Sequence, residues 1–212
     1  MAVYDLQEQE QIDDLRAWWD QYGKYVSAAI TVFAVVVISV QGWRWYQKNQ
    51  AEQASVLYMA LSQAVAAKDL SKAKDPATQI VDRYSRTAYA PRAALLYAKL
   101  QYDNNDRPGA KQQLQWVIDH SSEDELKAIA RFRLAEALLD DKQYDEALKT
   151  LDVKTDEAFA ALYADLKGDI LLAAGKPVEA RAAYEIAAAK IDPKSGYKPF
   201  VQVKLDALGS AK

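Results

Sequence analysis

Cysteine is absent from the 212 residues of this chain, and histidine occurs once, at His120. The lack of cysteine excludes disulfides, thiolate nucleophiles and cysteine-ligated metal sites. One histidine does not make an ordinary zinc site, because such sites take several histidine or cysteine ligands. We therefore assign no metal site to the sequence.

Signatures of catalysis and of cofactor binding are also missing. The chain has no glycine-rich phosphate-binding string and no nucleophile elbow, and its lysines and arginines are scattered. His120 falls at an expected helix end, where it would meet unpaired carbonyls. We predict a protein that is not an enzyme, takes no cofactor and binds no nucleic acid. An enzyme that uses clustered carboxylates is the least favoured alternative.

Glycine and proline are scarce, with seven and six residues, in a chain full of alanine, leucine, lysine, glutamate and glutamine. This composition favours helices over strands, because these residues are good helix formers. The fold class predicted is all-α.

Residues 25–43 are uncharged and lie between Lys24 and Arg44. About 20 apolar residues in a helix cross a hydrocarbon core of ~30 Å. Aromatic and basic side chains, which favour the membrane interface, gather at both ends of the run: Trp18, Trp19, Tyr22 and Tyr25 at the first, and Trp43, Arg44 and Trp45 at the second. We predict a transmembrane helix in contact with lipid; a buried core helix is the alternative.

Residues 1–24 form a short acidic segment with only two basic side chains. A cleavable signal peptide starts with basic residues and has a shorter apolar run, so we expect an uncleaved signal anchor. Ile12, Leu15 and Trp19 recur at helical spacing, which predicts an amphipathic surface helix; a solvated tail is the alternative. Two basic residues flank the span on each side, so charge alone does not fix its orientation.

Three segments in residues 44–212 repeat one pattern: a small residue, alanine twelve positions later, and a large residue four positions after that. The sets are Ala98, Ala110, Leu114; Ala135, Ala147, Leu151; and Gly168, Ala180, Tyr184. The period of 37 and then 33 residues resembles the tetratricopeptide pattern. We predict repeat units at about 88–120, 123–153 and 157–190, followed by a capping helix at 198–208. An unrelated helical bundle is the alternative.

The small residues have a physical reason. They are expected where the two antiparallel helices of a unit cross, because a larger side chain would push the axes beyond the usual ~8–10 Å. Stacked helix pairs of this kind form an α-solenoid with a groove lined by the first helix of each unit. Burial between helices is the alternative for each groove residue. The candidates for a partner-binding groove are Arg92, Leu95, Lys99, Tyr102, Ile129, Phe132, Glu136, Leu139, Leu162, Asp165, Asp169 and Leu172.

The chain resembles the ancillary Sec translocon subunit (YfgM) family along nearly its whole length. The resemblance is carried by Tyr4-Asp5, Glu8, Gln11, Leu15-Arg16, Trp18-Trp19, Tyr22-Gly23-Lys24 and Gly42-Trp43-Arg44, and by the strings SSEDELKAIARFRLAEALL, EALKTLD and DLKGDILLAAGKPVEARAAYE. It implies a TPR-like domain on a single bacterial inner-membrane anchor, with the N-terminus cytoplasmic and residues 44–212 periplasmic.

The resemblance also implies partners: the Sec translocon, a membrane-anchored periplasmic prolyl isomerase or chaperone, and unfolded exported chains. It implies no catalytic residue. The rival hypothesis is a TPR scaffold of a different envelope complex, one for division or cell-wall assembly.

Overall fold

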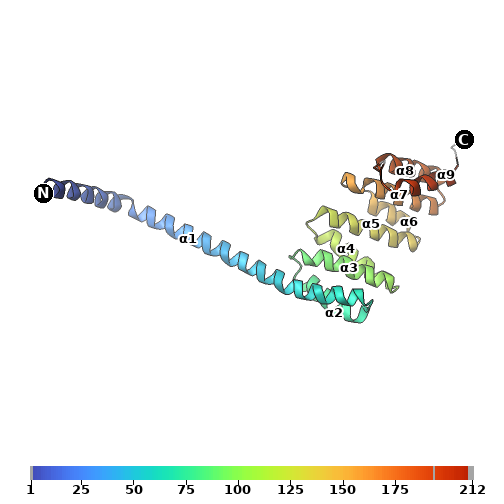
Figure 1. Ribbon diagram of the computed structural model, residues 1–212, viewed down its shortest axis with the longest axis horizontal. Coiled ribbons are helices and arrows are strands. Elements are labelled where there is room, and N and C mark those ends of the chain that lie inside the picture. Colours follow the sequence, from blue (N-terminus) through green and yellow to red (C-terminus); the bar gives the residue numbers. More distant parts are fainter. Residues whose placement is uncertain (1, 193, 210–212) are drawn as a thin grey trace. The chain divides into compact units, whose positions relative to one another are not determined.

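The computed structural model describes residues 2–192 and 194–209, with side chains from residue 11 onward. The described residues form nine α-helices, so the all-α prediction is confirmed (Figure 1). The chain divides into two compact units, Met1–Gln50 and Ala51–Lys212. The side chains of Tyr4, Asp5 and Glu8, which contributed to the family resemblance, lie outside the described ones.

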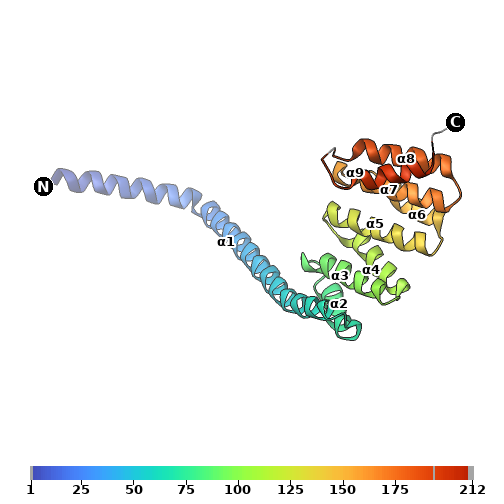
Figure 2. The same ribbon diagram turned by 45° about the vertical axis from the view of Figure 1, so that its right-hand side comes forward.

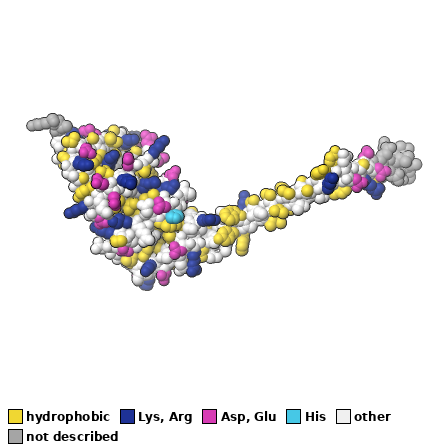
Figure 3. Space-filling view, turned by 180° about the vertical axis from the view of Figure 1, so that it is seen from behind, with side chains coloured by type: hydrophobic (Ala, Val, Ile, Leu, Met, Phe, Trp, Pro, Cys, Tyr) yellow, Lys and Arg dark blue, Asp and Glu magenta, His cyan; other side chains and the backbone are white. Residues whose placement is uncertain are grey.

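Helix α1, Ala2–Ala66, supplies the whole of the first unit and the first helix of the second. The segment before the apolar run is therefore helical. α1 contains a stretch long and apolar enough to cross a membrane, and none of it is buried within the protein. Figure 3 shows hydrophobic side chains covering this part of the helix. All seven expected interface anchors are exposed: Trp18, Trp19, Tyr22, Tyr25, Trp43, Arg44 and Trp45.

The second unit is a stack of antiparallel helix pairs, α3–α4, α5–α6 and α7–α8 following one another (Figure 2). These pairs cover residues 89–120, 124–151 and 157–190, and α9 follows them. The helices are α2 (Leu70–Arg83), α3 (Tyr89–Asp103), α4 (Arg107–His120), α5 (Asp124–Asp140), α6 (Tyr144–Leu151), α7 (Glu157–Ala173), α8 (Pro177–Lys190) and α9 (Lys198–Ala207).

The small residues of the repeat pattern lie inside the helix pairs. Ala98 is 2% exposed and Ala135 is fully buried, and Gly168 is buried against the ring of Tyr184. A Cβ atom on Gly168 would stand 2.4 Å from Cε1 of Tyr184, well inside van der Waals contact. The third pair therefore needs glycine because its second helix presents tyrosine where the other two present leucine.

A fourth helix pair, which the repeat pattern did not predict, precedes the other three. It consists of the end of α1 and α2, and its turn repeats the turns of the later pairs. Each turn has one residue with positive φ, whose successor donates its N–H to a carbonyl five residues back, the C-terminal motif of many helices. These residues are Lys68, Asn105, Lys142 and Gly175.

The fourth pair escaped the pattern because its two crossing residues are exchanged in size. Leu61 stands where the other pairs have a small residue, and Ala77 stands where they have a large one. Both are buried, with Leu61 at 0% and Ala77 at 1% exposure. A large and a small side chain fill the space between two crossing helices whichever helix carries the large one, so this pair also packs closely.

Helix α2 begins earlier than the proline suggests. Pro76 suits the first turn of a helix, which predicts a polar connection up to that residue. The helix begins at Leu70 instead, because the carboxylate of Asp69 accepts the N–H of Lys72 and caps it. Pro76 lies inside the helix and is buried there.

Candidate binding cleft between the first helices of the repeat units

A cleft of about 430 Å³ opens between α3, α5 and α7, the first helices of three successive pairs. This volume lies in the range of ligand pockets and takes a few side chains of a bound segment. The residues that line it are Ala98, Lys99, Tyr102, Asp103, Leu114, Arg133, Glu136, Leu139, Asp140, Leu166 and Asp169.

The apolar part of the cleft consists of Ala98, Leu114, Leu139 and Leu166. Ala98, Leu114 and Leu166 are almost fully buried and belong to the central core of the stack, whereas Leu139 is half-buried against that core. The cleft is therefore backed by close-packed side chains, which hold it in place without a ligand.

The rim is charged, and much of it is paired within the protein. Lys99 Nζ lies 2.7 Å from Asp103 one turn along α3. The Tyr102 hydroxyl donates to Asp140 at the end of α5, and Arg107 lies 3.6 Å from the same carboxylate. These contacts tie α3 and α4 to the end of α5.

Glu136 stands apart from the other acids of the rim. Within the described part of the chain its carboxylate has no hydrogen bond or ion pair. Glu136 is exposed at the rim, but desolvation by its surroundings raises its pKa above its usual value, Asp140 and Asp169 raise it further, and Arg133 acts in the opposite direction. The guanidinium of Arg133 donates to the carbonyl of Leu95, at 3.4 Å. Glu136 is thus an acceptor facing the cleft with its pairing capacity unused.

Asp169 lines the α7 side of the cleft and also contacts α9. Lys204 Nζ on α9 contacts Asp169 Oδ2 at 2.7 Å and both oxygens of Asp165 at 2.9 and 3.0 Å. The hydroxyl of Tyr184 donates to Asp169 at 2.7 Å, and that of Tyr197 donates to Asp165. Burial lowers the pKa of Lys204, but the two carboxylates outweigh it, so that the pKa ends above its usual value.

Five of the twelve predicted groove residues line the cleft: Lys99, Tyr102, Glu136, Leu139 and Asp169. For Leu95 and Asp165 the prediction of an open surface is wrong, since they are 7% and 3% exposed. Leu95 lies in the central core, and Asp165 is covered by the α9 segment through Tyr197 and Lys204.

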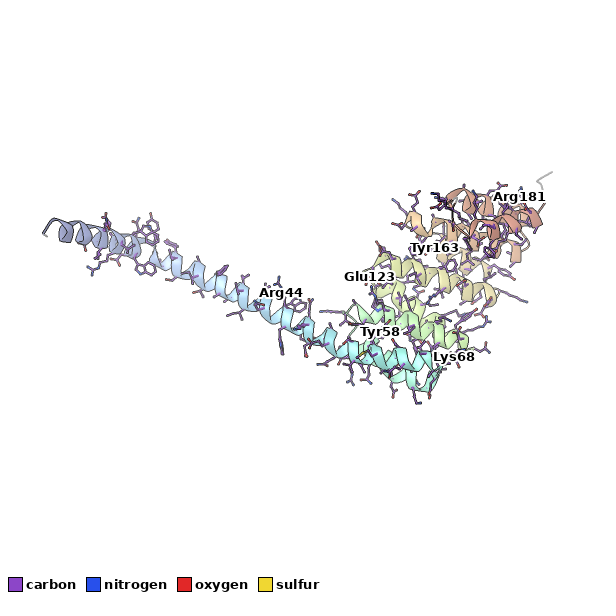
Figure 4. The ribbon with its side chains drawn as sticks, viewed as in Figure 1. Arg44, Tyr58, Lys68, Glu123, Tyr163 and Arg181 are labelled. Atoms are coloured by element: carbon purple, nitrogen blue, oxygen red, sulfur yellow. The ribbon has the colours of Figure 1, made fainter. Side chains whose placement is uncertain are left out.

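The other five predicted residues lie outside the cleft. Arg92 forms two 2.7 Å bonds with Glu123, joining the starts of α3 and α5; Glu123 is labelled in Figure 4. Phe132 stacks on Tyr163 of α7, whose hydroxyl donates to the carbonyl of Ala128; Tyr163 is labelled in Figure 4. Ile129 and Leu162 are half-buried, and Leu172 is 43% exposed.

Sequence reasoning missed six residues of the cleft: Ala98, Asp103, Leu114, Arg133, Asp140 and Leu166. Helical spacing offered a signal for all of them except Leu114, because the other five lie three or four residues from predicted groove positions. Leu114 lies on α4, the second helix of its pair, and no groove position was predicted there.

Comparison with known proteins places the chain in a family. The sequence profile described as a tetratricopeptide repeat-like domain matches residues 16–210. An ancillary SecYEG translocon subunit of Escherichia coli (strain K12) is 31% identical over 209 residues, 98% of this chain and 99% of the relative. This chain belongs to the ancillary SecYEG translocon subunit family.

Two further ancillary SecYEG translocon subunits agree with this assignment. The protein of Haemophilus influenzae is 35% identical over 186 residues, 86% of this chain and 89% of the relative. That of Neisseria gonorrhoeae is 30% identical over 212 residues, 98% of this chain and 100% of the relative. The matches to the Escherichia coli and Neisseria gonorrhoeae proteins each cover 98% of this chain, and so include the apolar part of α1 as well as the helix pairs.

Proposed function

We propose that this protein is a non-enzymatic scaffold of the bacterial inner membrane that works beside the Sec translocon. One span, residues 25–43, anchors it, residues 1–24 are cytoplasmic, and residues 44–212 form a periplasmic TPR-like domain. The observation that carries the proposal is that α1 joins an apolar stretch of membrane-crossing length to the first helix of a repeat stack. The Sec translocon is proposed as the partner because relatives of this chain are named ancillary SecYEG translocon subunits.

The partners proposed for the periplasmic domain are a membrane-anchored prolyl isomerase or another chaperone, and unfolded exported chains. The support is the open cleft between α3, α5 and α7, since stacks of helix pairs commonly use this surface for extended partners. Anchoring helps such binding, because confinement at the membrane raises the effective concentration of a partner at the channel without new contacts.

The orientation is tested with single cysteines, which the chain allows because it has none of its own. Asp14→Cys precedes the span and Lys190→Cys ends α8. In cells with an intact inner membrane and a permeable outer membrane, a membrane-impermeant maleimide is expected to label the Lys190 variant and spare the Asp14 variant. The reverse pattern would contradict the proposed topology.

The partners are tested by photo-crosslinking in living cells. A crosslinking residue at Ile38, in the apolar stretch, is expected to capture a translocon subunit, and one at Leu139, in the cleft, a folding factor or an exported chain. Glu179, exposed on α8 outside the cleft, is the matched control. Capture of a division or cell-wall complex from Ile38, with no translocon subunit, would overturn the proposal.

A further inference from the structure

The contacts of α9 with the last helix pair provide an example, within this protein, of a segment held by a first helix of the stack, α7. Val201 and Leu205 are buried against α7 and α8, and between them in sequence Lys204 reaches the two carboxylates of α7. Its ammonium also lies 5.4 Å from the centre of the Tyr184 ring. A lysine flanked by apolar side chains is thus held by an acidic pair above an apolar floor.

The cleft lies next to this α9-binding surface, on the side of α5 and α3, because Asp169 belongs to the cleft lining and also contacts α9. The cleft has the same combination of groups, a carboxylate beside apolar side chains. Leu139 and Leu166 are its floor, and the carboxylate of Glu136 faces it. The difference is that no residue of the described chain pairs with Glu136, whereas Lys204 pairs with Asp165 and Asp169.

We propose that the cleft binds a segment of a partner protein that carries a lysine or arginine among apolar residues, with the cation on Glu136 and the apolar neighbours on Leu139, Leu166 and Ala98. This inference rests on the proposed function, and it names the chemistry of the segment that the scaffold takes.

Charge complementarity selects a basic segment over an acidic one. The lining holds four carboxylates, Asp103, Glu136, Asp140 and Asp169, against two cations, Lys99 and Arg133. Three of these carboxylates already have partners, since Asp103 pairs with Lys99, Asp140 with Arg107 and Asp169 with Lys204. Glu136 is the carboxylate of the lining that no described residue pairs. An acidic segment would bring its charge beside Glu136 and Asp140, whereas a basic one gains a charge-assisted hydrogen bond in a site partly shielded from water.

The state of Glu136 supports the same choice. Glu136 is exposed at the rim, yet desolvation by its surroundings, together with Asp140 and Asp169, raises its pKa and so disfavours its ionised form. A bound cation within hydrogen-bond distance would relieve this penalty.

The test uses the full chain in lipid nanodiscs and three fluorescent peptides of about ten residues, long enough to cross the cleft. The peptides share an apolar sequence and differ at one central residue, which is lysine, norleucine or glutamate. Fluorescence polarisation is expected to give a Kd about tenfold lower for the lysine peptide than for the norleucine peptide, and a higher Kd for the glutamate peptide.

Glu136→Gln is expected to abolish the preference for lysine, so that the lysine and norleucine peptides bind alike. Glu125→Gln is the control, since Glu125 lies exposed on the same helix outside the cleft and should leave the preference unchanged. Unfolding curves of both variants show that the stack remains folded.

The inference is overturned if the lysine and norleucine peptides bind equally to the unaltered protein, or if Glu136→Gln keeps the preference. Equal binding would not contradict the proposed scaffold function, because a cleft without charge selectivity would still be able to bind exported chains. If none of the peptides binds, both the inference and the role of the cleft are overturned, while the crosslink from Ile38 still reports on the translocon independently.

Discussion

Pairs of single side chains set the distance between the helices of each repeat. Glycine faces tyrosine at Gly168 and Tyr184, and alanine faces leucine at Ala98 and Leu114. Each pair keeps the sum of the two volumes nearly constant, which close packing demands. The identity of one residue of a crossing therefore restricts the other.

Gly168→Ala is expected to lower the free energy of unfolding by about 2 kcal/mol, because the new methyl group overlaps the Tyr184 ring. Tyr184→Leu, which removes the ring, should cost stability by itself but relieve that overlap. In the double variant the loss is expected to be smaller than the sum of the two single losses by about 1 kcal/mol. Urea denaturation of all four proteins measures this coupling; strict additivity would show that the crossing is not the cause.

Gln101 shows where side-chain identity could not be interpreted from the sequence. It is a polar residue, yet it is only 6% exposed. Its amide donates to Asp106 at 2.8 Å and packs against Gly109, where a Cβ would lie 2.1 Å from Nε2. The sequence contains all three residues, but only the turn geometry between α3 and α4 brings them together.

The turns between paired helices also join one repeat to the next. Asp141, after α5, accepts Lys111 Nζ at 2.6 Å and Arg107 at 3.1 Å, both from α4 of the preceding pair. The hydrogen bond from Lys111 is the main cause that lowers the pKa of Asp141 below its ordinary value of 3.8. These contacts make the turn a link between successive pairs.

Asp141→Asn is expected to reduce stability at neutral pH by about 1 kcal/mol, a value discounted for the quarter of the side chain that water reaches. Because the folded pKa is lowered, the contribution is fully present above 3.8 and is lost as the pH falls through the folded value. The unaltered protein and the variant should therefore converge in strong acid.

Thermal unfolding over a pH series checks this prediction, with Asp152→Asn as the control, an exposed acid after α6. A gap between the unaltered protein and Asp141→Asn that persists unchanged in strong acid would contradict the electrostatic account.

Helix α9 depends on one lysine for its place. Lys204→Met is expected to cost about 2 kcal/mol, because it leaves the carboxylate of Asp165, 3% exposed, without a counter-charge. Adding Asp165→Asn should recover part of that loss. Lys198→Met, at the start of the same helix, is the matched control. Chemical denaturation distinguishes the variants, and equal losses for the two lysines would contradict the ionic role.

Helical periodicity predicted most of the helices because their apolar positions recur with small residues between them. The repeat pattern, by contrast, missed the pair formed by α1 and α2, where Leu61 and Ala77 exchange sizes. It also placed Leu95 and Asp165 on the groove. Which turn of a first helix faces the cleft depends on how far each pair is rotated against the next, and the sequence does not state that rotation.

The molecule as a whole depends on the apolar stretch of α1 for its place in the cell. Val36→Arg is expected to oppose insertion by about 3 kcal/mol, the cost of arginine near the centre of a span. After alkaline carbonate extraction, a larger share of the variant should appear in the soluble fraction. Gln63→Arg, exposed on the same helix but outside the apolar stretch, should stay in the membrane pellet. Equal partition of the two variants would show that residues 25–43 are not the anchor.

The stack is finished at both ends. Its first helix is the last part of α1, and its last pair carries α9, held by Lys204. Another repeat placed directly after α8 would have to displace α9 from Asp165 and Asp169. A helix pair inserted within the stack, such as a copy of α5–α6 ahead of the loop at residues 152–156, would leave these contacts in place.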